Sequence, residues 1–197
     1  MGRRIAIDGN SLSIEDLVAV ARGNVYVILS TEAKRRVASS RRTIEKWVSE
    51  DRTVYGVTTG FGPMCDISIA ISEVRKLQEN LIRSHSAGFG NPFPMDVVRA
   101  IMLLRANVLS KGYSGVRVQL LNTLVSMINQ RIHPIIPEVG SVGASGDLVP
   151  LAHMALAMMG KGEVEYGGRI VEAAYALKKE GIERVRLDSK EGIALIN

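Results

Sequence analysis

Hydrophobic residues recur at three- and four-residue steps through the middle of the chain, and this spacing predicts amphipathic helices. The pattern indicates six or seven helices, with short strand-like pieces near the beginning and near the end. No internal repeat and no low-complexity segment interrupts it. The expected fold class is therefore mainly α, in one unit that covers residues 1–197.

The first quarter of the chain contains one predicted strand and two predicted helices. Ile5–Asn10 (IAIDGN) alternates as a short strand does. Ser13 is placed to cap the first helix and Gly23 to end it. A longer helix is expected from Ser30 or Thr31 to about Glu50, with its basic face in water. The residues of that face are Lys34, Arg35, Arg36, Arg41 and Arg42.

Three further helices are predicted in the middle of the chain. The first runs from about Ser72 to Ser86 and brings His85 close to its buried stripe. The second lies between Pro94 and Lys111-Gly112, and the third between Val116 and about Arg131. Nearly continuous apolar faces on the last two are typical of central helices in a bundle. The second helix is expected to carry its apolar face on Val97, Ile101, Leu104 and Val108.

The last part of the chain predicts a small hairpin and a short helix. The pair Gly167-Gly168 suits a tight turn between two strands, because glycine accepts positive φ. A helix is expected from Glu172 to Glu180, ended by Gly181. The chain then stops in an apolar run at Asn197, which we interpret as a fragment of a longer chain with exposed apolar helix faces.

Composition excludes several classes of protein. The single cysteine, Cys65, cannot form an intrachain disulfide, and the first residues lack a secretory signal, so a reducing cytoplasm is expected. No apolar stretch reaches the ~20 residues that span a bilayer, so no membrane partner is expected. The formal charge of +5 is spread along the chain, which predicts a solvated surface and no nucleic-acid partner. No cluster has metal-ligand spacing, so no metal is expected.

Two glycine-rich segments are candidates for function. Tyr55–Pro63 (YGVTTGFGP) excludes a helix and predicts an ordered loop, which is either functional or a plain connector. The second segment has Gly140, Gly143 and Gly146 within seven positions and leads directly into an apolar helix near Leu148. It fits a packed turn, or an anion site at a helix N-terminus, although it lacks the lysine of a phosphate-binding loop.

A third interpretation of this segment is a self-made electrophile. In Ala144-Ser145-Gly146, the glycine nitrogen can attack the carbonyl carbon two residues earlier. Loss of two waters, the second with the serine hydroxyl, leaves a methylidene carbon conjugated with an imidazolone ring. Glycine allows the close approach, and the small alanine lets the turn compress.

Five blocks along the chain resemble the histidine and aromatic amino-acid ammonia-lyase family, which includes the aromatic aminomutases. They are Tyr55–Gly62 (YGVTTGFG), Leu77–Gly90 (LQENLIRSHSAGFG), Lys111–Arg117 (KGYSGVR), Gly140–Pro150 (GSVGASGDLVP) with His153 after it, and Lys190–Asn197 (KEGIALIN). The resemblance covers essentially all 197 residues as the N-terminal portion of a longer chain. It implies a helical bundle of the ammonia-lyase type with a small β-hairpin element, here truncated, an active-site loop at 55–63 and a prosthetic-group loop at 140–150.

The resemblance also implies the site residues. The catalytic set is Tyr55 in the mobile loop and the tripeptide Ala144, Ser145 and Gly146, which forms 4-methylidene-imidazol-5-one autocatalytically; the substrate-binding residues are His85 and Asn197. His85 lies where the family selects the substrate side chain, and Asn197 resembles the asparagine that contacts the prosthetic group. As a base, the tyrosine needs hydrogen-bond donors or positive charge around its phenolate.

Other roles for these residues stay open on the residues alone. Tyr55 also fits a hydrogen-bonded loop anchor, and His85 also fits a core histidine at a helix end. His153 is expected to be a core histidine rather than a catalytic one, and Cys65 is expected to be inert.

The implied activity is elimination of ammonia from L-histidine or another aromatic L-amino acid. Thr58 departs from the usual asparagine of the histidine lyases and resembles the aminomutases and some phenylalanine or tyrosine enzymes. An aromatic 2,3-aminomutase is therefore the alternative enzyme. An inactive scaffold or basic helical binding domain is the non-enzymatic alternative. Family members form homotetramers whose sites combine several subunits, so the fragment alone is expected to be inactive, with residues 144–146 unmodified.

Overall fold

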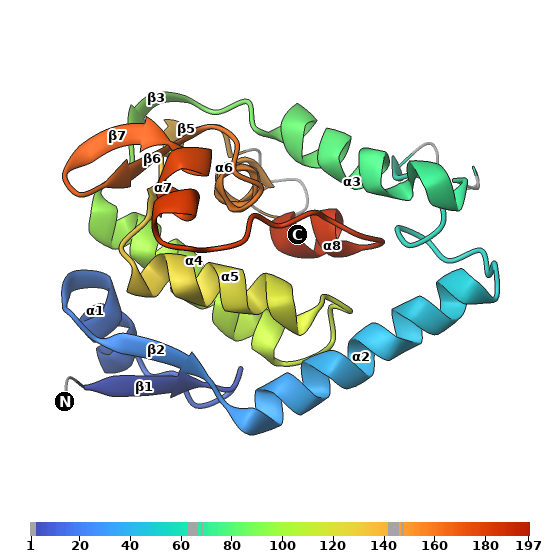
Figure 1. Cartoon of the computed structure of the whole chain (residues 1–197), viewed down its shortest axis with the longest axis horizontal. Coiled ribbons are helices and arrows are strands. Elements are labelled where there is room, and N and C mark those ends of the chain that lie inside the picture. The colour runs from blue at the N-terminus through green and yellow to red at the C-terminus, as the bar shows by residue number, and fades with distance from the viewer. Residues whose placement is uncertain (1–2, 63–66, 68, 142–145, 147) are drawn as a thin grey trace.

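The computed structural model describes residues 3–62, 67, 69–141, 146 and 148–197. Within them the chain forms eight helices and seven short strands (Figure 1). The mainly α fold class is therefore confirmed, with one helix more than the upper count that the pattern predicts. None of the described helices is long and apolar enough to cross a membrane.

A small βαβ unit begins the chain. Strands β1 (Arg4–Ile7) and β2 (Tyr26–Leu29) pair in parallel, and helix α1 (Ile14–Arg22) connects them. The predicted caps are confirmed: the Ser13 side chain accepts the Asp16 N–H, and the Gly23 N–H donates to a carbonyl of the last turn. Strand β2 is not among the predictions, because its sequence YVIL is apolar at every position and shows no alternation of apolar and polar residues.

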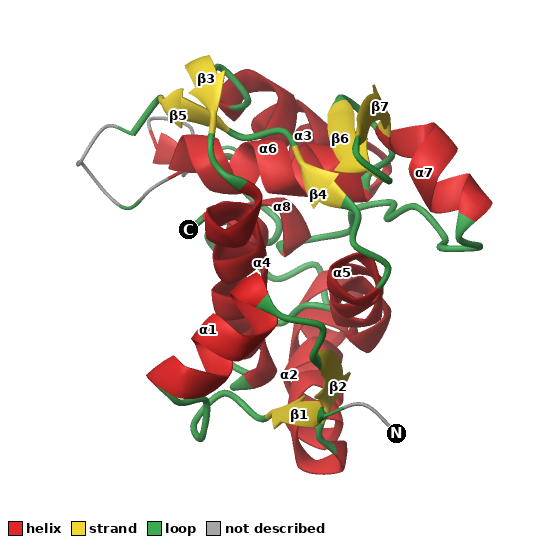
Figure 2. Ribbon diagram, turned by 90° about the vertical axis from the view of Figure 1, so that its left-hand side faces the viewer, coloured by secondary structure: helices red, strands yellow, loops and turns green. Residues whose placement is uncertain are grey.

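Two central helices, α4 (Met95–Ser110) and α5 (Val118–Asn129), separate the two halves of the molecule. Both views place β1, β2 and α1 on one side of this pair and α6 with β3–β7 on the other (Figures 1 and 2). The largest fully buried side chains include many from these two helices: Met102, Leu103, Leu109, Leu120, Leu121, Leu124, Met127 and Ile128. The prediction that these helices form the centre of the bundle is confirmed.

The predicted apolar face of α4 points outward. Leu104 and Val108 are 46% and 47% exposed, whereas Met102 and Leu109 on the neighbouring face are buried. The prediction of this particular face as the core face was wrong, because α4 is apolar around most of its circumference and periodicity alone could not select one side. The expectation of exposed apolar helix surface is confirmed on this stripe.

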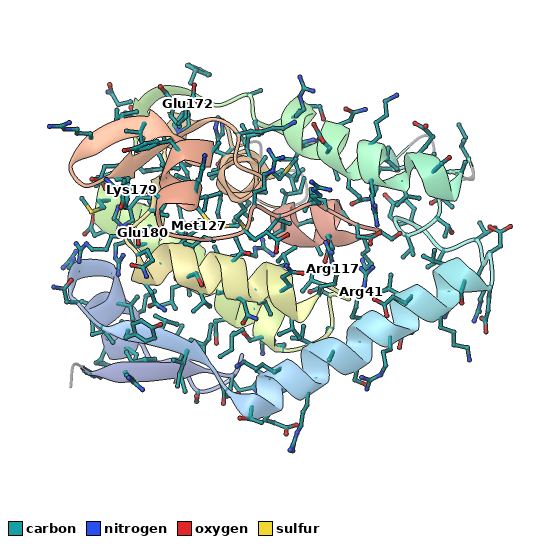
Figure 3. The ribbon with its side chains drawn as sticks, in the orientation of Figure 1. Arg41, Arg117, Met127, Glu172, Lys179 and Glu180 are labelled. Atoms are coloured by element: carbon teal, nitrogen blue, oxygen red, sulfur yellow. The ribbon has the colours of Figure 1, made fainter. Side chains whose placement is uncertain are left out.

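Helix α2 (Thr31–Ser49) lies along one edge, capped by Ser30 as predicted. Its basic face is only partly in water. Arg41 is 6% exposed and donates from Nη1 to the Ser189 carbonyl at 3.0 Å (Figure 3). Arg36 is half-buried and donates to the Asp8 carbonyl at 2.5 Å. The solvent-facing prediction was wrong for these two arginines, because carbonyl groups of neighbouring loops need the donors that they supply.

The remaining elements form the other half. Helix α3 (Ile71–His85) packs on α6 (Leu148–Met158), and both contact the C-terminal helix α8 (Glu191–Ile196). The predicted hairpin is confirmed, with Gly167 and Gly168 at positive φ in its turn. The strands of this half are β3 (Phe89–Pro92), β4 (His133–Pro134), β5 (Pro137–Val139), β6 (Glu163–Tyr166) and β7 (Arg169–Glu172), and helix α7 (Ala173–Lys179) follows them. β3 pairs with β5, and β4, β6 and β7 form a three-stranded sheet.

A buried arginine and histidine join the two halves. Arg99 is 3% exposed and donates to the carbonyls of Val20 and Ile128, at the ends of α1 and α5. It also lies 3.1 Å from Nε2 of His133. Because a guanidinium only donates, this nitrogen is the acceptor, and Nδ1–H donates to the Glu165 carboxylate at 2.5 Å. Burial lowers the pKa of His133.

Stability is expected to fall in acid because of His133. Its pKa is lower in the folded protein than the unfolded value of 6.5, so the unfolded chain binds the proton first as pH decreases. The stabilisation that neutral His133 gives the folded protein is complete above about pH 6.5 and decreases below it. The total loss is ~1.4 kcal/mol for each unit by which the folded and unfolded pKa values differ. Thermal unfolding at pH 7.5 and 5.5 tests this. His133→Gln keeps an acceptor and a donor without titrating, and an equal acid loss in that variant would contradict the assignment.

Candidate functional site

The C-terminal helix brings Asn197 to the glycine-rich loop. Oδ1 of Asn197 lies 3.3 Å from the position that a Cβ on Gly146 would occupy. Gly146 has φ +115°, a backbone conformation that side-chain-bearing residues rarely adopt. The Asn197 carbonyl accepts from Arg105 Nη1 at 3.1 Å, which fixes this end of α8 on α4. Two of the predicted site residues are therefore in contact.

The rest of the predicted tripeptide falls outside the described part of the chain. Ala144 and Ser145 belong to the residues that the structure does not describe, as does Cys65. The expectation that residues 144–146 are unmodified is therefore not tested.

A buried carboxylate anchors the beginning of α8. Glu191 is fully buried and accepts from Arg117 through Nε at 2.9 Å and Nη2 at 2.6 Å. It also accepts the backbone N–H groups of Arg117 and Asp188, both at 2.9 Å. This hydrogen-bonded carboxylate raises the pKa of Arg117. Four donors on one carboxylate compensate its desolvation, so the pair fixes α8 to the start of α5.

Glu191→Ala is expected to lower the free energy of unfolding by ~3–5 kcal/mol, because it leaves the Arg117 charge and two backbone donors without their acceptor. Chemical denaturation measures the effect. The matched control is Glu183→Ala, which removes an exposed carboxylate that accepts from Gln119 at 2.8 Å. That change is expected to stay within about 0.5 kcal/mol. Similar losses in the two variants would show that Glu191 is not an anchor.

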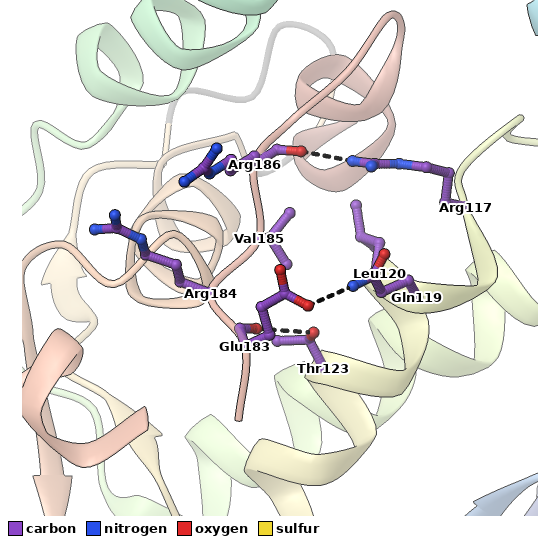
Figure 4. Close-up of a pocket in the computed structure, with 8 residues that line it drawn as sticks. All are labelled: Arg117, Gln119, Leu120, Thr123, Glu183, Arg184, Val185 and Arg186. Atoms are coloured by element: carbon purple, nitrogen blue, oxygen red, sulfur yellow. Dashed lines mark hydrogen bonds between the residues drawn. The ribbon is translucent and has the colours of Figure 1, made fainter. Parts of the chain in front are cut away.

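Figure 4 shows the pocket beside this anchor, between α5 and residues 183–186. Arg117 Nη2 donates across it to the Arg186 carbonyl, and Thr123 Oγ1 donates to the Glu183 carbonyl. Its lining residues are Arg117, Gln119, Leu120, Thr123, Glu183, Arg184, Val185 and Arg186. None of the predicted site residues lines this pocket, and the two hydrogen bonds across it join the C-terminal segment to α5.

The loop that carries Tyr55 contacts α8 near its middle. A Cβ at Gly56 would lie 3.9 Å from Cγ2 of Ile193, and it would also meet the ring of Phe61. Tyr55 is 59% exposed, packs edge-on against Phe61, and accepts the Gly62 N–H at its hydroxyl oxygen at 3.3 Å. The described part of the predicted loop, residues 55–62, is thus free of α-helix, as the pattern predicts, and Pro63 lies outside the described residues.

Thr58 holds the loop together from inside. Its side chain is 4% exposed, donates to the Arg52 carbonyl at 2.6 Å and accepts the Val54 N–H at 2.9 Å. Both hydrogen-bonding directions of the hydroxyl are therefore used within the loop. The Thr58 hydroxyl therefore stabilises the backbone that leads into the loop.

His85 lies half-buried at the C-terminal end of α3. Its Nδ1 is 2.8 Å from the Leu81 carbonyl, which only accepts, so the proton is on Nδ1. Ser84 shares this interaction, at 3.1 Å from the same nitrogen. Nε2 of His85 is consequently an acceptor, and no described group donates to it.

His153 connects the segment after His85 to helix α6. The Gly88 N–H donates to Nε2 of His153 at 3.1 Å, and burial lowers the pKa of this histidine. A Cβ at Gly88 would meet His153, Pro137 and Val149 at 3.1–3.2 Å. The prediction of a core histidine is supported, because the only described partner of this ring is a backbone group.

The described predicted residues thus lie on four segments, the Tyr55 loop, α3, the glycine-rich loop and the end of α8, and some of the links between them are indirect. Asn197 touches Gly146, the Tyr55 loop touches α8, and His85 is linked to α6 through Gly88. No described contact joins Tyr55 to His85. Within the described residues, no group of three or more His, Cys, Asp or Glu side chains could hold a metal ion.

Sequence reasoning missed Gln78 and Glu191. Gln78 is 1% exposed, between the buried residues Val74 and Ile82 on α3, and its Oε1 accepts the Gly192 N–H at 2.8 Å. The available signal was a polar residue within a buried stripe, four positions after one apolar residue and four before another. Glu191 gave a similar signal, as an acid directly before an apolar run.

Comparison with known proteins agrees with this geometry. The family model described as aromatic amino acid lyase matches residues 12–197. The chain belongs to the aromatic amino acid lyase family. Among its relatives, histidine ammonia-lyase from Clostridium tetani is 55% identical over 195 residues, and the one from Caldanaerobacter subterraneus is 53% identical over the same length. Each alignment covers 99% of this chain and 38% of the relative.

Solved structures of the family share the fold. A tyrosine aminomutase from Streptomyces globisporus is 41% identical with a TM-score of 0.92, over 98% of this chain and 36% of that one. Histidine ammonia-lyase from Trypanosoma cruzi is 38% identical with a TM-score of 0.91, over 98% and 37%. The chain thus spans somewhat more than a third of the length of these family members, and the predicted ammonia-lyase type of fold is confirmed for that part.

Proposed function

We propose that the full-length protein is an ammonia-lyase that eliminates ammonia from L-histidine. The observation that carries the proposal is the contact between Asn197 Oδ1 and Gly146, which unites the two blocks expected to hold the prosthetic group. The family relatives named histidine ammonia-lyase, at 51–55% identity, support histidine as the substrate.

The proposed prosthetic group is 4-methylidene-imidazol-5-one, made from Ala144, Ser145 and Gly146. Gly146 fits this role, because its positive φ and missing Cβ leave room directly beside the Asn197 amide. When formed, the group supplies an electrophile that turns the substrate amine into a better leaving group. Asn197 would hold this group and orient the substrate next to it.

Tyr55 is proposed to remove the β-proton of the substrate. The Gly62 N–H, at 3.3 Å from its hydroxyl oxygen, stabilises negative charge there. Such a weakly acidic proton is removed only where solvent is excluded. Since Tyr55 is 59% exposed, we propose that its cover comes from elsewhere in the assembled protein, which would be a homotetramer.

His85 is proposed to select the substrate side chain. Its Nε2 lone pair accepts an N–H or O–H donor, because Nδ1 carries the proton. An imidazole or a phenol offers such a donor, and a phenyl ring does not. This chemistry favours histidine or tyrosine over phenylalanine.

The experiment that tests the function is product analysis with the full-length protein. L-histidine, L-tyrosine and L-phenylalanine are supplied separately, and products are identified by mass. We expect ammonia and an unsaturated acid from histidine, and a protein mass lower by two waters than its sequence requires. A protein with neither the mass deficit nor any product would refute the proposal.

An aromatic aminomutase is the second candidate. Thr58 and the structural likeness to a tyrosine aminomutase favour it. The hydrogen bonds of Thr58 within its own loop weaken the first of these arguments. The same assay decides, because a mutase yields a β-amino acid in place of free ammonia.

A further inference from the structure

Helix α8 begins without a cap of its own. It has six residues, and Lys190 at its N-cap position has φ +69° and no side-chain hydrogen bond to the helix. So short a helix is unstable in isolation, and its first N–H groups need acceptors from elsewhere. The position of α8 therefore depends on its neighbours.

Gln78 of α3 supplies one of these acceptors. Its Oε1 accepts the N–H of Gly192, the second residue of α8, at 2.8 Å. A Cβ at Gly192 would lie 2.8 Å from this oxygen and 3.0 Å from the Gln78 carbonyl. The missing side chain of Gly192 therefore lets α3 and α8 approach closely enough for the bond.

The nitrogen of the Gln78 amide shows that burying this side chain is unfavourable in free energy. Nε2 is buried and has no hydrogen-bond partner in the described part of the chain. A buried donor without an acceptor is unfavourable, and an apolar side chain would fill the same stripe between Val74 and Ile82 without that cost. The hydrogen bond by which the Gln78 oxygen caps α8 thus explains why an amide occupies this buried position.

The far end of α8 carries the group that needs this precision. Asn197 follows directly after the helix, its N–H donates to the Ile193 carbonyl, and its Oδ1 lies against Gly146. Glu191 fixes the start of α8 to Arg117, on the side of α5, and Gln78 fixes it to α3. Two anchors on different elements define the direction in which α8 presents Asn197.

We propose that Gln78 is a positioning residue of the reaction, which acts by capping α8 and so placing the Asn197 amide at the prosthetic-group loop. The inference rests on the proposed function. A displacement of a binding group by about 1 Å can cost ~10²-fold in rate. Loss of the cap should therefore lower kcat by a large factor and lower the free energy of unfolding only slightly.

The test compares four variants of the full-length protein. Gln78→Met has a similar length and no acceptor, and is expected to lower kcat about 10- to 100-fold with the two-water mass deficit retained. Gln78→Glu keeps an acceptor for Gly192 and is expected to restore most of the rate. Gly192→Ala pushes α3 and α8 apart at this close contact, so it should lower kcat; the higher helix propensity of alanine offsets part of the lost packing. Gln119→Met, which removes an exposed amide that donates to the Glu183 side chain, is the control.

Hydrogen exchange gives a readout that does not depend on activity. The peptide 190–197 is expected to exchange faster in Gln78→Met and in Gly192→Ala than in the wild type, and at the wild-type rate in Gln119→Met. Unchanged exchange in both test variants would overturn the proposal. If Gln78→Met fails to fold, Gly192→Ala still decides, and a wild-type kcat in Gly192→Ala also overturns the inference.

A double-mutant cycle with Asn197→Ala separates positioning from general support. If Gln78 acts through Asn197, adding Gln78→Met to Asn197→Ala should reduce kcat by less than threefold further. If the two substitutions instead lowered kcat independently of each other, Gln78 would not act through Asn197. A wild-type protein that lacks both the mass deficit and turnover would instead refute the proposed function, so the two failures are distinguishable.

Discussion

Replacing Ser145 with alanine is expected to abolish turnover and to leave the protein at the mass that its sequence requires. The reason is chemical: the second dehydration removes the serine hydroxyl, and alanine has none to lose. Without the methylidene carbon there is no electrophile, so the rate should fall by at least the ~10³-fold that removal of a principal catalytic group typically costs. Intact-protein mass and the ultraviolet absorption of the imidazolone measure the result.

The matched control for this change is Ser126→Ala on α5, which removes a serine hydroxyl outside the glycine-rich loop. It is expected to retain the mass deficit, the absorption and the activity. Persistence of the absorption in Ser145→Ala would show that the tripeptide is not its source. The assignment of the loop would then fail.

Tyr55→Phe is expected to lower kcat by ~10²–10⁴-fold while the prosthetic group still forms. The change removes only the hydroxyl, which accepts the Gly62 N–H, and leaves the edge-on contact with Phe61 in place. The loop should therefore keep its shape. Steady-state kinetics with L-histidine, together with intact mass, separates loss of the base from loss of the group.

The control is Tyr175→Phe on α7, whose side chain has a similar exposure of 53% against 59% for Tyr55. It is expected to have wild-type kinetics. An unchanged kcat in Tyr55→Phe would favour the loop-anchor interpretation of this residue. A raised KM with unchanged kcat would assign it to binding instead.

Local signals account for the parts of the fold that were predicted correctly. Ser13 and Ser30 cap their helices through their own side chains, and the Gly167-Gly168 turn depends on two adjacent residues. Helix α8 gave no such signal, because its cap comes from Gln78 and its other anchor from Arg117, both far away in the sequence. Arg41 was misassigned for the same reason, since its main partner is the carbonyl of the distant Ser189.

The candidate site likewise contains residues that the sequence predicts and residues that it does not. Its expected reactive residues are inferred from blocks that resemble a family, and the structure places Asn197 beside Gly146 of one of these blocks. The residues that hold these groups in place were not recognised. The role of a buried carboxylate such as Glu191 becomes clear only when its four donors are placed around it, and three of them belong to Arg117, 74 residues away in the sequence.

The hydrogen bond from Gly88 to His153 limits how substrate preference could be altered by protein engineering. Because it ties the turn beyond His85 to the helix that follows Gly146, a bulky replacement in that turn would press on the scaffold of the reactive loop. Libraries aimed at new amino-acid substrates should accordingly randomise Ser84 and His85 and leave Gly88 and His153 constant. Under the proposed function, selectivity would then change without disturbing formation of the prosthetic group.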